Sequence, residues 1–246
     1  MNITIIGASA GIGLETVKRG LNRNHSITTL SRSEIEIKEK KSLNMILGDA
    51  TNKADLINSI QQADAIIVTL GTGRDMKATT LFSDFAKLIV EINREKKMDV
   101  PFIFVTGFGA GESKNYVPWI VKLFLKYLLK DVYADKTKME EIITNSDLNW
   151  TVVRPANIFG EYDNFDGTGT VIATQCKKIS ESTNEIEAWG DGSPIRDFVY
   201  AGDVANGLIK IYQDEVNDVV NLGSGIEITI KEIVNKNKYF IYYITK

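Results

Sequence analysis

Three glycines near the start of the chain constrain its possible folds more than any other feature. Gly7, Gly11 and Gly13 directly follow the apolar run of residues 2–6 and precede a segment with helical periodicity. A strand, a glycine-rich turn and a helix in this order leave backbone N–H groups and the helix N-terminus free to attract an anionic pyrophosphate. The sequence therefore predicts a dinucleotide-binding turn. Its expected cofactor contacts are Gly7, Ser9, Ala10, Gly11, Ile12 and Gly13.

Short apolar runs alternate with helical patterns over the first 155 residues. Strands are expected at residues 2–6, 26–31, 43–48, 64–69, 101–106 and 149–153. Helices are expected between them, near residues 11–23, 52–61, 78–96 and 116–146. Parallel strands need crossover connections of this kind. The alternation predicts an α/β fold, with a Rossmann-type doubly wound parallel sheet in an NAD(P)-binding domain at residues 1–155.

The sequence pattern changes beyond Pro155, where glycines separate short segments. Residues 156–235 are expected to form a small, incomplete C-terminal substrate region that packs on the same sheet. Its helices are expected at residues 168–180, 201–213 and 229–235, and its strands at 185–189 and 219–222. The aromatic tail at residues 236–246 fits no period, so no structure is predicted for it.

Composition narrows the class of protein. The formal net charge is -3, so no basic field favours nucleic acid. A single cysteine, Cys176, and a single histidine, His25, predict neither an internal disulfide nor a structural zinc site. We therefore expect a small-molecule substrate and no metal.

Two apolar segments bear on the compartment. The first residues lack the basic segment and long apolar run of a signal peptide, which favours a cytoplasmic protein. The stretch from Trp119 to Leu129 is shorter than a membrane span and carries lysines at helical spacing. It is interpreted as an amphipathic helix, with a membrane-surface or homodimer contact as the alternatives.

The end of the second expected strand predicts which dinucleotide binds. An NAD site usually places Asp or Glu there to bind the ribose hydroxyls. This chain has Ser31 and Arg32, which favour the 2′-phosphate of NADP; NAD binding and a merely solvated arginine are the alternatives. Ligands of open α/β sheets bind at the carboxyl ends of the strands, so further contacts are expected after the third and fourth strands. They are Asp49, Ala50, Leu70, Gly71 and Thr72.

Four segments of the first 156 residues form a recognisable set: Gly7–Gly13, Thr106–Ser113, Val132–Lys136 and Leu148–Pro155. Together they resemble the atypical short-chain dehydrogenase/reductases with an NAD(P)H-binding domain of the flavin reductase and biliverdin reductase B type. The resemblance implies NADPH binding and hydride transfer to a flat acceptor, or sensing of the cofactor without catalysis. Members of this type generally lack the tyrosine–lysine pair of the ordinary family.

Other segments resemble a different branch of the superfamily. They lie at residues 154–160, 162–165, 189–200, 202–205 and 221–225. Residues 154–235 are similar to the substrate region of NAD-dependent nucleotide-sugar epimerases, dehydratases and GDP-fucose synthases. In those enzymes the arginine matching Arg196 approaches the sugar-nucleotide phosphates, which suits a bidentate guanidinium. The two resemblances meet at Arg154-Pro155 and imply substrate contacts at Phe108, Asn157 and Arg196.

Carbonyl chemistry in this superfamily usually needs Tyr-x-x-x-Lys, in which the lysine lowers the pKa of the phenol and holds the ribose. The chain lacks that spacing, because Val132 stands four residues before Lys136 and Tyr133 only three. Lys136 is expected at the cofactor ribose. Tyr133 is expected about 100° round the helix from the usual position, as a packing or substrate-wall residue, with a role as an acid as the alternative. Thr106 is either a substrate-binding hydroxyl or a strand residue, and it completes the candidate catalytic set.

These observations favour an NADPH-dependent oxidoreductase that transfers hydride to a small flat or carbonyl acceptor. Hydride transfer to a flavin-like ring needs little acid–base help. The missing Tyr-x-x-x-Lys therefore counts against epimerase chemistry more than against a reductase. Two alternatives stay open: an enzyme that acts on a nucleotide sugar, and a catalytically silent NADP-binding regulatory protein.

Overall fold

A central parallel sheet organises the molecule. The computed structural model describes residues 1–37, 41–72, 79–116, 130–161, 163, 170–181 and 190–235. Seven strands of this described part form one sheet in the order β3-β2-β1-β4-β5-β6-β9, and every pair of neighbours is parallel. They are β1 (Asn2–Ile6), β2 (Ser26–Ser31), β3 (Leu43–Leu47), β4 (Ala65–Val68), β5 (Pro101–Val105), β6 (Asn149–Pro155) and β9 (Val219–Leu222).

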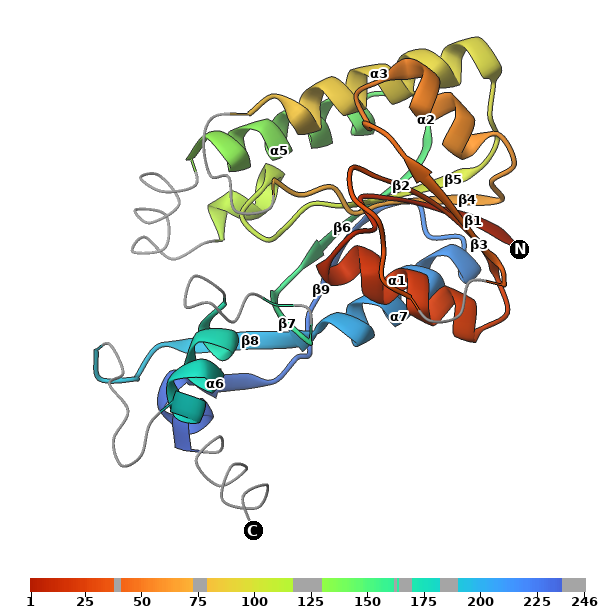
Figure 1. The fold of residues 1–246 in the computed structure, drawn as a ribbon. Coiled ribbons are helices and arrows are strands. Elements are labelled where there is room, and N and C mark those ends of the chain that lie inside the picture. Colours follow the sequence, from red (N-terminus) through yellow and green to blue (C-terminus); the bar gives the residue numbers. More distant parts are fainter. Residues whose placement is uncertain are drawn as a thin grey trace.

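Helices cover both faces of the sheet (Figure 1). One face carries α2 (Lys53–Ile60), α3 (Leu81–Lys96) and α5 (Lys130–Thr144), and the other carries α1 (Gly11–Asn22) and α7 (Ala201–Gln213). Each layer has its own apolar cluster. Phe82, Phe102 and Phe104 belong to the first cluster, whereas Val17 and Leu208 belong to the second. The fold class predicted from the sequence, a Rossmann-type doubly wound sheet, is confirmed.

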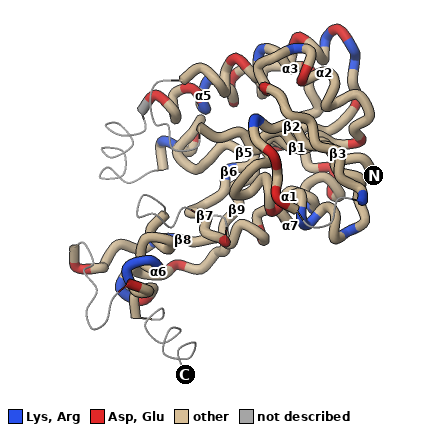
Figure 2. The backbone as a smooth tube through the Cα atoms, viewed as in Figure 1, with Lys and Arg blue, Asp and Glu red and all other residues tan. Residues whose placement is uncertain are grey.

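Charged residues lie mainly on the helices and loops around the central strands (Figure 2). Both signs alternate along α3, which carries Asp84, Lys87, Glu91 and Arg94. In the described residues, no helix has the length and apolar character that a membrane crossing requires. The same residues contain no group of three His, Cys, Asp or Glu side chains that could hold a metal ion.

A second, smaller sheet follows the central one. In it β8 (Ile195–Tyr200) pairs in parallel with β7 (Asn157–Phe159) and antiparallel with β10 (Glu227–Thr229), next to helix α6 (Val171–Glu181). The chain returns from this sheet to the central one through α7 and β9, which pairs with β6. Residues 230–235 are helical, close to the helix expected at 229–235.

Several sequence expectations concern other parts of the chain. The helix expected at 116–146 is described only over α5, and a 3-10 helix, η1 (Gly111–Asn115), precedes it. The stretch from Trp119 to Leu129, the strand expected at 185–189 and the tail at 236–246 lie outside the described residues. The division into domains at Pro155 stays a prediction.

Candidate dinucleotide and catalytic site

The glycine turn joins β1 to α1 with the backbone geometry that its glycines permit. Gly7 has φ +87° and Gly11 has φ +52°, conformations that residues with a Cβ rarely adopt. The Gly7 N–H donates to the Leu30 carbonyl at 2.9 Å, which ties the turn to β2. A Cβ added at Gly13 would lie 2.4 Å from the Gly7 carbonyl oxygen and 2.6 Å from Thr69 Oγ1. Gly13 therefore allows α1 to approach the strand ends closely.

The N-terminus of α1 fits an anionic ligand. Ala10 is the N-cap residue and its methyl side chain makes no capping hydrogen bond, and the first turn contains no acidic residue. The first N–H groups of a helix have no partner within the helix. Ser9 and Ala10 are both exposed. The chain therefore leaves donors and a partial positive charge at this turn, which suits a pyrophosphate.

The strand ends beside this turn carry the other expected cofactor contacts. Arg32 is exposed, whereas Ser31 is buried and donates through its hydroxyl to the Ser33 carbonyl at 2.8 Å. Hydrogen bonds from Thr51 hold the pKa of Asp49 below its usual value, and attraction by Arg32 adds to the effect. Arg32 and Asp49 therefore lie at one edge of the sheet. Ala50 is buried, Gly71 is exposed, and Leu70 and Thr72 are half-buried.

Lys136 projects from α5 towards the end of β5. Its Nζ donates to the Thr106 carbonyl at 2.7 Å and lies 5.2 Å from the centre of the Phe82 ring. Burial lowers the pKa of Lys136 to about 8, although attraction by Glu140 opposes the shift. The amine is therefore held in place with a pKa well below that of an ordinary lysine, as a group that binds a ribose or moves a proton can have.

Tyr133 lies beside Lys136 despite the unusual spacing. The Lys136 Nζ is 5.8 Å from the centre of the Tyr133 ring. A Cβ added at Gly107 would lie 3.6 Å from the Tyr133 hydroxyl and 3.9 Å from the Lys136 Nζ. Both polar atoms thus face the backbone at Gly107. Burial raises the pKa of Tyr133, so the phenol keeps its proton at neutral pH.

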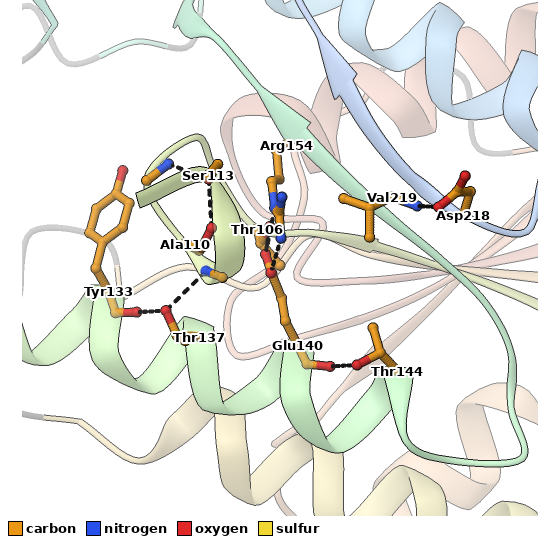
Figure 3. Close-up of polar contacts among 12 residues, drawn as sticks. Thr106, Ala110, Ser113, Tyr133, Thr137, Glu140, Thr144, Arg154, Asp218 and Val219 are labelled. Carbon is orange, nitrogen blue, oxygen red and sulfur yellow. Dashed lines mark hydrogen bonds and ion pairs between the residues drawn. The ribbon is translucent and has the colours of Figure 1, made fainter. Parts of the chain in front are cut away.

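Thr106 turns its hydroxyl into a buried polar cluster (Figure 3). The hydroxyl donates to Glu140 Oε1 at 2.6 Å. Arg154 holds the same carboxylate through Nη2 at 2.5 Å and Nε at 3.2 Å. Because the Thr106 proton is used by Glu140, this hydroxyl can offer a substrate only its lone pairs. Thr106, Glu140 and Arg154 are all buried.

The loop after β5 is tied to α5. The Gly111 N–H donates to Thr137 Oγ1 at 3.1 Å, and the Ser113 hydroxyl accepts from the Gly109 N–H and donates to the Ala110 carbonyl (Figure 3). Phe108 lies within this loop and is 42% exposed. The loop therefore presents an aromatic side chain on a backbone that is fixed at several points.

The remaining expected substrate contacts belong to the second sheet. Asn157 donates through Nδ2 to the Asp197 carbonyl at 2.9 Å, and half-buried Arg196 donates to the Ile195 carbonyl at 2.8 Å. No contact described here joins Asn157 or Arg196 to Lys136. Burial alone would raise the pKa of Asp197, but hydrogen bonds from Ser224 and Gly225 outweigh it and lower that pKa. Asp197 therefore anchors the turn that follows β9.

The chain matches the model of a known protein family. The model of a family described as NAD(P)H-binding matches residues 7–189. This chain belongs to the NAD(P)H-binding family. The match begins at the first glycine of the turn and continues beyond Pro155, into the region that resembles nucleotide-sugar enzymes.

Curated relatives of this NAD(P)H-binding chain include enzymes named for nucleotide sugars. GDP-L-colitose synthase of Yersinia pseudotuberculosis is 24% identical over 249 residues, which cover 94% of this chain and 79% of that protein. GDP-L-fucose synthase 1 of Arabidopsis thaliana is 33% identical over 86 residues, or 32% of this chain. The match spans 26% of the length of that fucose synthase. The match to a second protein of the same plant, named putative GDP-L-fucose synthase 2, also spans 26% of that protein's length.

Solved structures share the fold of the NAD(P)H-binding chain over nearly its whole length. A UDP-glucose 4-epimerase of Thermotoga maritima, solved with UDP-glucose, has a TM-score of 0.75 at 18% sequence identity. The match covers 99% of this chain and 83% of the epimerase chain. A dTDP-glucose 4,6-dehydratase of Bacillus anthracis, solved with NAD, has a TM-score of 0.74 at 17% identity, with 98% and 81% covered. The resemblance to NAD(P)H-binding proteins is confirmed by the family match, and the resemblance to the epimerase and dehydratase group is confirmed as a similarity of sequence segments and of fold.

Glu140 and Arg154 are not among the candidate site residues that the sequence predicts. The sequence singles out Arg154 only in the dipeptide at which the two resemblances meet, and it indicates no role for Glu140. The sequence does contain one signal for Glu140. It stands four positions after Lys136, and residues at this spacing share a helix face.

Proposed function

We propose that this chain is an NADPH-dependent oxidoreductase that transfers hydride to a small flat or carbonyl acceptor. The observation that carries the proposal is the uncapped N-terminus of α1 at the glycine turn. In the parallel sheet this turn lies at the same carboxyl edge as the end of β5, where Lys136 and Tyr133 face Gly107. A dinucleotide bound along this edge would bring its pyrophosphate to the turn and its nicotinamide towards Gly107.

Preference for NADPH over NADH rests on the end of β2. Arg32 is exposed there, in the place where an acidic residue would repel a 2′-phosphate. Ser31 adds little to this preference as a donor, because its hydroxyl already donates to the Ser33 carbonyl. The proposed selectivity therefore depends on the guanidinium.

Three side chains would have different roles near the nicotinamide of the bound cofactor. A bound reduced nicotinamide supplies the hydride. Lys136, held by the Thr106 carbonyl, would donate to the ribose hydroxyls. Tyr133, whose pKa is raised by burial, retains a phenol proton that can be donated to an oxygen of the acceptor. Exposed Phe108 would stack on a flat acceptor.

The direct test is oxidation of NADPH and NADH by the purified protein with a flavin, a quinone or biliverdin, followed by absorbance of the reduced nicotinamide. We expect turnover with NADPH and much less with NADH. Tyr133→Phe should slow reduction of a carbonyl acceptor and leave reduction of a flavin nearly unchanged, because hydride transfer to a flavin needs little acid–base help. Tight NADPH binding without turnover on any acceptor would favour the regulatory alternative.

A second candidate function is catalysis on a nucleotide sugar. The specific observation is the similarity to a UDP-glucose 4-epimerase, which covers 99% of this chain and so includes the second sheet with Arg196. Thermal shift with GDP- and UDP-sugars tests it. Stabilisation that is lost in Arg196→Ala but kept in Arg23→Ala, an exposed arginine beyond α1, would favour this candidate over a small flat acceptor.

A further inference from the structure

The buried ion pair between Glu140 and Arg154 joins α5 to β6. Its closest atoms are 2.5 Å apart, and both side chains are less than a tenth exposed. Gly111 packs directly on the pair, because a Cβ there would lie 2.0 Å from Glu140 Oε2 and 2.3 Å from Arg154 Nη2. Burial of two charges is costly unless their geometry is favourable. Two hydrogen bonds from Arg154 and the close packing of Gly111 therefore fix the position of the Glu140 carboxylate.

Thr106 connects this pair to Lys136. Its hydroxyl donates to Glu140 Oε1 at 2.6 Å, while its carbonyl accepts from the Lys136 Nζ at 2.7 Å. Lys136 and Glu140 are also one helical turn apart on α5, so they share a face of that helix. Glu140 is therefore connected to the Lys136 amine by the two hydrogen bonds of Thr106. The two side chains also lie on the same face of α5.

We propose that Glu140 is a positioning residue for Lys136: with Arg154 it fixes Thr106, and through Thr106 it holds the Lys136 amine at Gly107 in its charged form. This inference rests on the proposed function for its consequence, which is binding of the cofactor ribose. Arg154 orients the carboxylate through two hydrogen bonds. Glu140 in turn supplies the negative charge that favours the ammonium form of Lys136.

The other ionisable groups whose side chains are described on the elements around Lys136 have partners elsewhere or face solvent. Tyr133 stays neutral because burial raises its pKa. Asp135 accepts from the Phe82 and Ser83 N–H groups of α3, and Asp84 and Lys87 are paired on the surface of α3. The exposed groups are Asp131, Lys138 and Glu141 on α5, Glu112 and Lys114 on η1, and Glu91, Arg94, Glu95 and Lys96 on α3. Among these described groups, Glu140 is the carboxylate that bears on Lys136.

Glu140→Gln tests the proposal, since it keeps the shape of the side chain and removes its charge. The titration of Lys136 is followed by NMR of carbon-13 in the lysine ε-methylene, in the protein without cofactor. We expect its midpoint to fall from about 8 by roughly half a pH unit or more. NADPH affinity, measured over the same pH range, should fall by up to about threefold above pH 8 and little at pH 7, because a half-unit fall in the midpoint lowers the ammonium fraction by that factor only above the midpoint.

Glu141→Gln is the matched control, because it removes the same charge from the neighbouring exposed position of α5. It should leave the Lys136 midpoint at the wild-type value. If Glu140→Gln does not fold because Arg154 is left unpaired, Glu140→Gln with Arg154→Met removes both buried charges and is read by the same criterion. An unchanged Lys136 midpoint in the folded variant overturns the inference.

The two readouts separate this inference from the proposed function. A shifted Lys136 midpoint in a protein that binds neither NADPH nor NADH would support the role of Glu140 and refute the dinucleotide function. NADPH binding that persists with an unshifted Lys136 midpoint would support the dinucleotide function and refute the role of Glu140.

Discussion

Arg32 is the residue on which the choice between the two dinucleotides depends. Arg32→Ala should weaken NADPH binding by about one to two orders of magnitude, since a charge-assisted hydrogen bond contributes about 1.5–3 kcal/mol. NADH affinity should hardly change, because NADH carries no 2′-phosphate. Fluorescence titration with both cofactors measures this, with Arg23→Ala as an exposed control. Equal losses for NADPH and NADH would assign Arg32 a structural role instead.

Gly111 occupies a position where any side chain meets the buried ion pair. Gly111→Ala should destabilise the fold by about 2 kcal/mol or more, from overpacking against Glu140 and Arg154 and from a left-handed backbone at φ +54°. Gly225→Ala is the control, because Gly225 has φ +71° but open space around its Cβ position. Urea denaturation of both variants separates steric clash from backbone strain. Similar losses in the two would show that the clash is relieved at little cost.

Lys136 should make stability depend on pH in a definite direction. Its folded pKa of about 8 lies below the ordinary 10.5, so the unfolded chain holds more protons between these values. This group's unfavourable contribution is therefore full below about pH 8 and disappears as the pH rises towards about 10.5. Lys136→Met should raise the free energy of unfolding near pH 7 by on the order of 1–2 kcal/mol, and less near pH 10. A constant difference across this range would contradict the assignment.

The sequence indicated candidate residues where the signal was local. The glycine turn was evident from spacing alone, and Lys136 from its family segment. The cluster of Thr106, Glu140 and Arg154 was not, because its members are 34 and 14 residues apart and meet only when α5 packs against β5 and β6. Tyr133 illustrates the same limit, since its spacing did not indicate that its hydroxyl would face Gly107 beside Lys136.

Two glycines of the β1–α1 unit are expected to have different roles, Gly13 in packing and Gly11 in cofactor binding. Gly13→Ala should destabilise the unit by about 1–3 kcal/mol, because the added Cβ would lie 2.4 Å from the Gly7 carbonyl oxygen. Gly11→Ala meets nothing within 4 Å and carries mainly backbone strain at φ +52°, of about 1–2 kcal/mol. We expect Gly11→Ala to weaken NADPH binding much more than its stability loss explains, since its methyl group occupies the phosphate approach. Calorimetric titration alongside thermal unfolding measures both quantities. Full NADPH affinity in Gly11→Ala would contradict the site at this turn.

Elements with strong periodicity were predicted to within a few residues. The six expected strands of the first part correspond to β1–β6, because buried parallel strands give continuous apolar runs. The second sheet was missed. Its outer strands β7 and β10 are three residues each and form only by pairing with β8, which is remote in sequence from β7. Short strands of this kind leave no periodic signal.

At the scale of the whole molecule, the two sides of Pro155 share one apolar cluster. Ile5 and Val17 from the first part pack in it with Val199, Val204 and Leu208 from the second. Sequence analysis expected the second part to pack on the same sheet, but periodicity alone could not indicate that β9 extends the sheet next to β6. Because α7 packs on the same face as α1, the helix after the glycine turn and the helix after β8 share this apolar cluster.

This shared cluster predicts how the molecule unfolds. Leu208 is fully buried on α7 within the shared cluster, so Leu208→Ala should cost about 2–5 kcal/mol. Because both parts share that cluster, the loss should appear in a single denaturant transition. Native-state hydrogen exchange should then show reduced protection of amides in β1 as well as in α7. Loss of protection confined to α7 and β9, with β1 unaffected, would show that the parts divided at Pro155 unfold as separate units.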